Sequence, residues 1–399
     1  MASTPSSSTL PIATPETPRQ LAELLGESAA RGQAISPVGG GSKLAFGNPL
    51  SRETQRVSTK SLDKILAYEP DDMTISVEAG ATIESVWREL AARGQTIPIE
   101  VPAPNVETIG GLIATGLCGP RRLGSGSLRD ALIGIQAAYP DGTLGNAGGM
   151  VVKNVSGFDL MRMHLGALGT LGVVVSANFK VVPAARAEAT VLADRASLSE
   201  LESDRVSVGS GRIRPISFEA HRNRDAWRVA TRIEGRPATV DQMARELAER
   251  LGDGRVIVSD ESRDFWTRYV AKEAFPDETD QFVAQLRDKP ARTIRTLETA
   301  LATFDSAGVS VEDIRVSLGL GTVRVTGTTR DETSTALADA IRRLRNDGVT
   351  VLIVSAPESV TREVGTFGTS EDVLELMRQL KQQFDPRSVL NPGRVIPEL

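Results

Sequence analysis

Three glycine-rich segments in the first half of the chain constrain its fold more than any other feature. They are Ser36–Lys43, Pro102–Asp130 and Gly148–Val174. Because glycine has no Cβ, a backbone rich in glycine can turn sharply and approach another main chain or a ligand closely. We therefore expect the main chain of these segments, more than its side chains, to form a packing or binding surface.

The first segment has the composition of an anion-binding loop. The glycines from Gly39 to Gly41 let successive backbone N–H groups turn towards one anion, and Ser42 adds a hydroxyl donor. Such a loop can hold a pyrophosphate without a P-loop, whose Walker spacing is missing here. A flexible surface turn explains the same residues equally well.

The second segment leaves a strip of backbone nearly free of side chains, which suits close packing or a flat ligand. The small residues of this strip are Gly110, Gly111, Ala114, Gly116, Gly119, Gly124 and Gly126. Arginines border it at Arg121, Arg122 and Arg129, and for any one of them a solvated surface position is the commoner explanation. In the third segment, Gly166–Gly172 has the spacing G-x-x-G-x-x-G, which argues against a nicotinamide-binding Rossmann site.

Charge and cysteine content argue against several classes of function. The 399 residues carry 51 acidic and 46 basic side chains, whereas a nucleic-acid partner needs a basic face. We find no secretory signal and no apolar run long enough to span a membrane, so we expect a cytoplasmic protein that meets membranes only through partners. The single cysteine, Cys118, cannot hold an iron–sulfur cluster, and two histidines leave no expected metal site.

Hydrophobic periodicity predicts an α+β chain without repeats of fixed period. We expect a strand over Thr74–Ala79, then a helix with Thr82 as its N-cap and Gly94 after its last turn. Two more helices are expected over Val240–Leu251 and Asp331–Arg345. A last helix from Ser370 is expected to bury Val373, Leu376, Met377, Leu380 and Phe384.

Changes in amino-acid composition divide the chain into four parts. Residues 1–17, rich in Ser, Thr and Pro, are expected to be a disordered tail. Residues 18–183 hold most of the glycine clusters, and residues 184–347 have more charge and fewer glycines. Residues 348–399 begin with a strand near Val349–Ser355, and we expect this whole part to pack back on residues 18–183.

Taken in order, the three segments resemble the FAD-binding domain of the vanillyl-alcohol oxidase and p-cresol methylhydroxylase (PCMH-type) superfamily. The ending Phe384-Asp385-Pro386, with Leu390 to Arg394, looks like the C-terminal signature of its FAD-linked oxidases. The resemblance implies an FAD-binding domain of two α+β subdomains, an α+β cap, and a C-terminal segment that returns to the FAD domain. The cofactor-binding residues it implies are Val38, Gly39, Gly40, Gly41, Ser42, Lys43, Pro102, Thr108, Ile109, Gly110, Gly111, Ala114, Gly116, Arg121, Gly124, Ser125, Gly126, Ser127, Gly169, Gly172, Val173 and Asn391.

A narrower resemblance is to the FAD-binding (E-type) subunit of bacterial glycolate oxidase. It rests on Cys118–Asp130 and Val152–Leu160, and it is weakest over residues 184–347. It implies two partners, a larger FAD-linked oxidase subunit and an iron–sulfur subunit, and a small 2-hydroxy acid as substrate. Covalent flavin attachment in the superfamily uses a His or Cys, which the Val38–Lys43 loop lacks, so we expect non-covalent FAD.

The catalytic residues stay unknown at this stage. Relatives that oxidise 2-hydroxy acids carry histidines in the C-terminal half, where this chain has only His221, and we expect His164 to pack against a glycine-rich turn. Arg324 and Arg394 are candidate clamps for a carboxylate, but no base is visible. We expect an accessory redox subunit; the alternatives are a self-sufficient FAD-dependent oxidoreductase and a structural subunit without flavin.

Overall fold

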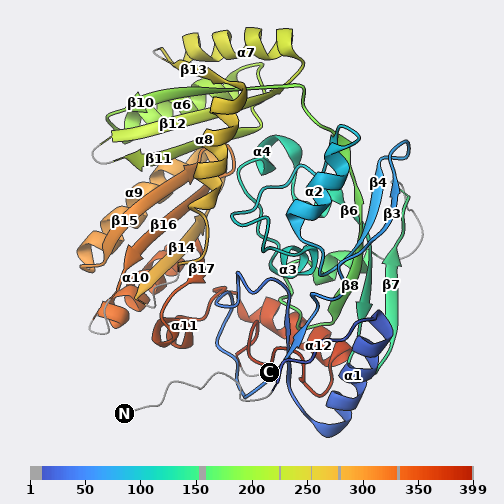
Figure 1. Cartoon of the computed structure of the whole chain (residues 1–399). Coiled ribbons are helices and arrows are strands. Elements are labelled where there is room, and N and C mark those ends of the chain that lie inside the picture. The colour runs from blue at the N-terminus through green and yellow to red at the C-terminus, as the bar shows by residue number, and fades with distance from the viewer. Residues whose placement is uncertain are drawn as a thin grey trace.

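The chain folds into an N-terminal half and a second half, the cap, which meet near residue 184 (Figure 1). The computed structural model describes residues 11–151, 159–223, 226–252, 254–276, 280–329 and 333–397. Residues 152–158, which belong to the narrower resemblance, lie outside this description.

Two small layers build the N-terminal half. A parallel pair, β1 (Ile35–Val38) and β2 (Gln55–Ser58), packs with α1 (Pro18–Arg31). Next to it lies an antiparallel sheet of five described strands in the order β3-β4-β8-β6-β7. Its elements and connections are β3 (Ile65–Glu69), β4 (Thr74–Glu78), α2 (Ile83–Ala91), β5 (Gln95–Thr96), α3 (Ile109–Thr115), α4 (Arg122–Ser125), α5 (Leu128–Ala131), β6 (Leu132–Ala138), β7 (Leu144–Gly148), the 3-10 helix η1 (Leu160–His164), β8 (Val173–Lys180) and β9 (Val182–Pro183).

The strand and helix expected after residue 74 are confirmed. Thr82 caps α2, because its hydroxyl accepts a hydrogen bond from the backbone N–H of Ser85 at 3.2 Å. The apolar face of α2 is buried through Ile83, Val86 and Leu90. These features depend on neighbours within a few residues, which is why the local sequence predicts them.

The cap is built on one sheet of eight described strands in the order β13-β10-β12-β11-β15-β16-β14-β17. Its strands are β10 (Ala187–Arg195), β11 (Ser217–Asn223), β12 (Ala226–Gly235), β13 (Arg255–Val258), β14 (Gln281–Arg287), β15 (Ser310–Ser317), β16 (Thr322–Thr328) and β17 (Thr350–Ser355). Its helices are α6 (Leu198–Ser210), α7 (Pro237–Arg250), α8 (Ser259–Ala271), η2 (Pro290–Arg292), α9 (Thr293–Ser306), α10 (Ser334–Asn346) and α11 (Glu358–Val364).

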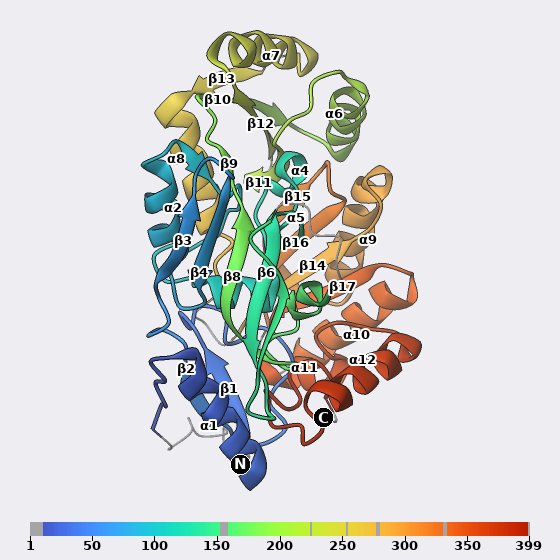
Figure 2. The ribbon, with the colours of Figure 1, turned by 90° about the vertical axis from the view of Figure 1, so that its right-hand side faces the viewer.

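The two faces of the cap sheet are covered differently. Helices α6, α7, α9 and α10 share one large apolar core with the sheet, and Figure 2 shows α6 and α7 at the far end of the cap. Helix α8 covers part of the opposite face through Trp266, Tyr269 and Val270, which pack on Ala230. The rest of that face is turned towards the N-terminal half, and its exposed side chains are therefore available to a site between the halves.

The strand expected to return to the N-terminal half instead belongs to the cap. Strand β17 pairs antiparallel with β14 at the edge of the cap sheet. The return comes later, with α12 (Glu371–Phe384) and the tail, where Leu390 forms a parallel bridge with Ile35 of β1 (Figure 1). An apolar strand can pair with any open sheet edge, so the sequence alone misplaced it.

Two further expectations were wrong in part. Helix α12 leaves Val373 and Leu376 43% and 56% exposed, because only its Lys381 side packs deeply on the N-terminal half. In the expected disordered tail, Ala13 forms a parallel bridge with Val57 and exchanges backbone hydrogen bonds with β2, which orders this part of the chain. Residues 1–10 lie outside the described residues.

Candidate functional site

The three glycine-rich segments come together around an elongated cavity, here called the glycine-lined cavity. It consists of two adjoining hollows that share Pro37, Val38, Gly39, Gly111, Ala114, Leu168 and Asn391. The predicted site residues that line it are Val38, Gly39, Gly40, Gly41, Ser42, Lys43, Thr108, Gly110, Gly111, Ala114, Gly169, Gly172, Val173 and Asn391. Parts of the chain more than 300 residues apart in sequence therefore meet at one surface.

The Gly39–Lys43 loop has backbone donors to offer a ligand. Among the hydrogen bonds of the described residues, none is donated by the five backbone N–H groups from Gly39 to Lys43. The loop also lies hard against the next segment: a Cβ on Gly40 would stand 1.8 Å from the carbonyl oxygen of Val106. Only glycine fits there, so the main chain itself forms the cavity wall and its free donors suit an anion.

Asn391 supplies an unsatisfied acceptor to the same cavity. Its side-chain amide donates to the carbonyl of Leu168 at 2.7 Å, and its backbone N–H donates to Ile35 at 2.9 Å. Its buried Oδ1 has no hydrogen-bond partner within the described chain. A buried acceptor without a partner is costly, so a ligand hydroxyl or amino group would be favoured there. The free donors and this acceptor fit a dinucleotide such as FAD.

A buried ion pair holds Asn391 in place. Lys381 of α12 is 4% exposed and donates to Asp385 at 2.6 Å and to the carbonyls of Thr170 and Leu390 at 2.8 Å each. Asp385 in turn accepts from the backbone N–H of Leu390 at 2.7 Å. The C-terminal segment that resembles FAD-linked oxidases, Phe384 to Arg394, is thus fixed by the Lys381–Asp385 pair so that Asn391 lies at the cavity. We call this pair and the segment it holds the clasp.

His164 forms part of the cavity wall and packs as expected. A Cβ on Gly172 would stand 3.1 Å from its ring, and Tyr139 shares a 3.2 Å hydrogen bond with its Nε2. Burial lowers the pKa of His164 to about 4, so its ring is neutral at physiological pH. We see a packing role here.

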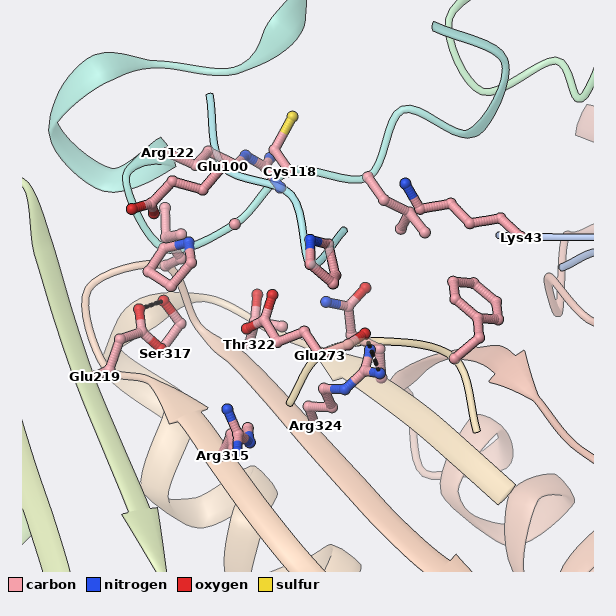
Figure 3. Close-up of a pocket in the computed structure, with 17 residues that line it drawn as sticks. Lys43, Glu100, Cys118, Arg122, Glu219, Glu273, Arg315, Ser317, Thr322 and Arg324 are labelled. Carbon is pink, nitrogen blue, oxygen red and sulfur yellow. Dashed lines mark hydrogen bonds between the residues drawn. The ribbon is translucent and has the colours of Figure 1, made fainter. Parts of the chain in front are cut away.

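A second cavity, the junction cavity, lies between the N-terminal half and the cap (Figure 3). Lys43 lines both cavities and so marks where they adjoin, while its ammonium group pairs with the buried carboxylate of Glu107. In Figure 3 Lys43, Glu100 and Cys118 lie on the N-terminal side, with predicted site residue Pro102 also in the lining. Cys118 is partly exposed, and burial of its sulfur raises the pKa of the thiol.

The cap side of the junction cavity carries carboxyl and guanidinium groups. Glu219 accepts hydrogen bonds from Ser317 at 2.6 Å and from Tyr269 at 3.3 Å. Burial raises the pKa of Glu219 well above its ordinary value, and burial also raises that of Glu273. Arg324, a candidate clamp from the sequence, lines this cavity. Arg394, the other candidate, lines the glycine-lined cavity and donates to the carbonyl of Asn48 at 3.1 Å.

Arg121 lies in an ion-pair network between the halves, here called the latch. It pairs with Glu100 at 3.2 Å and donates to Glu234 of the cap at 2.7 Å, while Arg232 pairs with Glu100 and with Glu188. The predicted site residues that line neither cavity, apart from Arg121 itself, are Ile109, Gly116, Gly124, Ser125, Gly126 and Ser127. Gly124 packs on the cap instead, where a Cβ would stand 2.8 Å from the Cα of Ile216.

Comparison with known proteins shows which family has this architecture. Residues 10–158 match the FAD binding domain model, and residues 363–395 match the C-terminal domain of FAD linked oxidases. The glycolate oxidase subunit GlcE of Escherichia coli (strain K12) is 31% identical over 363 residues, which are 90% of this chain and 92% of that protein. The chain belongs to the GlcE-like family of FAD-linked oxidases.

Other relatives agree with the GlcE-like assignment at greater distance. The glycolate oxidase subunit GlcD of Bacillus subtilis (strain 168) is 29% identical over 185 residues, 46% of this chain and 39% of that protein. The solved structure of an alkyldihydroxyacetonephosphate synthase superposes with a TM-score of 0.70 at 17% identity, covering 96% of this chain and 75% of the other. That likeness confirms the α+β FAD-binding oxidase fold. In the described ranges, every helix is too short or too polar to cross a bilayer.

Three residues of the GlcE-like cap have ionisable side chains at the site but were not predicted from the sequence. They are Glu219, Glu273 and Arg315. All three line the junction cavity. A carboxylate or an arginine is ordinarily expected to be solvent-exposed, and nothing in the sequence marks these three as buried. In Ser217–Asn223, for example, Glu219 stands among the polar residues His221, Arg222 and Asn223, so the strand does not distinguish it.

Proposed function

We propose that this chain is the FAD-binding subunit of a glycolate oxidase-type complex that oxidises a small 2-hydroxy acid. Flavin binding rests on one observation above all, the run of free N–H groups from Gly39 to Lys43 in a cavity lined by all three glycine-rich segments. The complex and the hydroxy acid are supported by the Escherichia coli relative, which is a glycolate oxidase subunit.

In this proposal each part of the glycine-lined cavity holds one part of FAD. The backbone of Gly39–Ser42 would hold the pyrophosphate, because free N–H donors suit phosphate oxygens. The strip from Thr108 to Ala114 would lie along the flavin ring, and Gly169–Val173 with Asn391 would hold the adenosine half. When bound, FAD supplies a two-electron acceptor for the alcohol carbon of the substrate.

The proposal includes partners because this chain cannot complete the electron path alone. A path from a flavin to one-electron acceptors commonly runs through iron–sulfur centres, which need several cysteines, and this chain has only Cys118. We propose a larger FAD-linked oxidase subunit and an iron–sulfur subunit, with any membrane contact made through them. Affinity capture after co-expression with candidate subunits tests this; recovery of the chain alone would argue against the complex.

The spectrum of the purified chain tests flavin binding directly. We expect a flavin absorbance with about one FAD per chain, and a colourless protein that cannot be reconstituted with FAD would overturn the proposal. Acid precipitation then tests the mode of binding. We expect all yellow colour in the supernatant, since Cys118 is the one thiol near the site; colour left on the pellet would show a covalent link.

A further inference from the structure

One row of side chains crosses the cap sheet and ends in the junction cavity. Residues that stand opposite one another in neighbouring strands define it, from β10 through β12, β11, β15 and β16 to β14. Because opposite residues in adjacent strands project from the same face of a sheet, the row forms one continuous polar line. Its members are Asp194, Arg228, His221, Arg315, Arg324 and Gln285.

Two arginines stand directly opposite each other in this row. Arg315 of β15 faces Arg324 of β16, and like charges in opposing positions destabilise a sheet unless something neutralises them. Within the described residues Arg315 pairs with the carboxylate of Asp313 at 2.8 Å, and it also donates to the carbonyl of Tyr269 at 2.7 Å. A further anion beside Arg324 would therefore stabilise the pair.

Arg324 is the member of the pair with donors to spare. Its Nη2 donates to the backbone carbonyl of Glu273 at 3.0 Å, and its buried Nε has no hydrogen-bond partner within the described residues. By contrast Arg228, farther along the same row, is held by a two-point pair with Asp194 at 2.8 and 3.1 Å. Arg228, outside the cavity, thus has its carboxylate partner, whereas Arg324, inside the cavity, keeps an unsatisfied donor.

Three carboxyl groups, those of Glu219, Glu273 and Glu100, line the same cavity as the pair. Burial raises the pKa of Glu219 well above its ordinary value and raises that of Glu273, which favours their neutral acid forms. On the opposite wall Glu100 is already paired with Arg121 and Arg232. The floor of the junction cavity therefore presents the two guanidinium groups, with the carboxyl group of Glu219 and the hydroxyl of Ser317 beside them (Figure 3).

We propose that Arg315 and Arg324 form a carboxylate clamp, so that this chain binds a small 2-hydroxy acid by itself, without its partners. Guanidinium groups match a carboxylate with paired hydrogen bonds. Ser317 and Glu219 line the same cavity and would pair with a hydroxyl group on the neighbouring carbon. The choice of a hydroxy acid rests on the proposed function, whereas the preference for a carboxylate rests on the clamp itself.

Calorimetric titration of the purified full chain with glycolate tests the clamp. We expect Arg324→Met to weaken glycolate binding by about 10- to 100-fold, the usual effect of losing hydrogen bonds to a charged group. Glycolamide, an uncharged analogue of the same size, should bind weakly to the unaltered protein. Arg228→Met is the matched control, because it removes an arginine from the same row and face and should leave glycolate affinity unchanged.

Several outcomes would overturn the clamp: glycolamide binding as tightly as glycolate, Arg324→Met binding glycolate normally, or no glycolate binding by a chain that carries its flavin. If Arg324→Met does not fold, as judged by circular dichroism, Arg324→Lys serves instead and should retain the charge but lose most of the affinity. The flavin absorbance is recorded on every sample. If the proposed function is wrong, the purified protein will lack flavin. If only the clamp is wrong, the protein will contain flavin but will not bind glycolate more tightly than glycolamide.

Discussion

At the scale of single residues, Gly40 shows why the first glycine loop tolerates no side chain. Its Cα lies so close to the main chain of Val106 that a Cβ would reach within 1.8 Å of that carbonyl oxygen. Carbon and oxygen atoms cannot approach that closely, so any substitution must displace the loop from the cavity. The same loop carries the free N–H groups on which flavin binding is proposed to depend.

We predict that Gly40→Asp weakens FAD binding by about 100-fold or more, because it displaces the donors and places a carboxylate near two phosphates. The flavin-to-protein absorbance ratio after purification measures this. Gly209→Asp is the control, since a Cβ at Gly209 meets nothing within 4 Å. Full flavin occupancy in Gly40→Asp would show that the pyrophosphate lies elsewhere.

His164 makes stability depend on pH in a defined direction. Its pKa is lowered by burial from 6.5 to about 4, so between these values the unfolded chain binds more protons than the folded one. Stability should be full above about pH 6.5 and should fall as pH drops towards 4, at about 1.4 kcal/mol per unit of pKa difference. Urea unfolding at pH 7 and pH 4.5 measures how much the free energy of unfolding falls between these pH values. His164→Gln should make this fall smaller; the same fall in the variant and the unaltered protein would contradict the prediction.

At the scale of elements, α12 and the tail act as a clasp rather than as a buried core helix. Apolar Val373 and Leu376 remain exposed, while the charged pair Lys381 and Asp385 is buried. Burying an ion pair costs solvation, which the pair recovers through its hydrogen bonds to Thr170 and Leu390. The clasp therefore fixes where the tail crosses the glycine-lined cavity.

We predict that Asp385→Asn destabilises the protein by roughly 3 kcal/mol, because the buried ammonium of Lys381 loses its counter-charge. FAD affinity should fall as well, since Asn391 would lose its fixed position. Glu371→Gln on the same helix is the matched control: Glu371 forms an exposed pair with Arg378, so its loss should cost less than about 0.5 kcal/mol. Equal urea midpoints for the two variants would refute the clasp.

At the scale of the whole molecule, the latch joins the halves on one side of the junction cavity. Arg121 and Glu100 come from the N-terminal half, and Arg232, Glu188 and Glu234 come from the cap. The groups are largely buried, so removing one arginine leaves carboxylates without enough positive charge. We therefore expect the latch to couple the unfolding of the two halves.

We predict that Arg121→Met costs about 3 kcal/mol and turns a single unfolding transition into two, as the cap separates from the N-terminal half. Calorimetry and urea unfolding followed by tryptophan fluorescence measure both effects. Arg88→Met removes an exposed arginine of α2 that pairs with Glu84, and it should leave one transition. A single transition of unchanged midpoint in Arg121→Met would show that the latch does not hold the halves together.

The sequence by itself determined the local features of this protein. The Thr82 cap, the buried face of α2 and the donor-rich loop from Gly39 to Lys43 all follow from residues a few positions apart. The family resemblance was also readable, because the glycine segments and the ending occur in a fixed order, and the GlcE-like comparison confirms it.

Only the tertiary structure decided which distant residues meet. Strand β17 joined the cap because apolar strands pair with whichever edge is open, and Arg121 took partners as far away as Glu234, 113 residues on. The opposition of Arg315 and Arg324 depends on hairpin register, and a shift of one residue would turn either arginine to the other face. Charge at the junction cavity thus arises from pairing geometry and burial, which composition and local pattern do not encode.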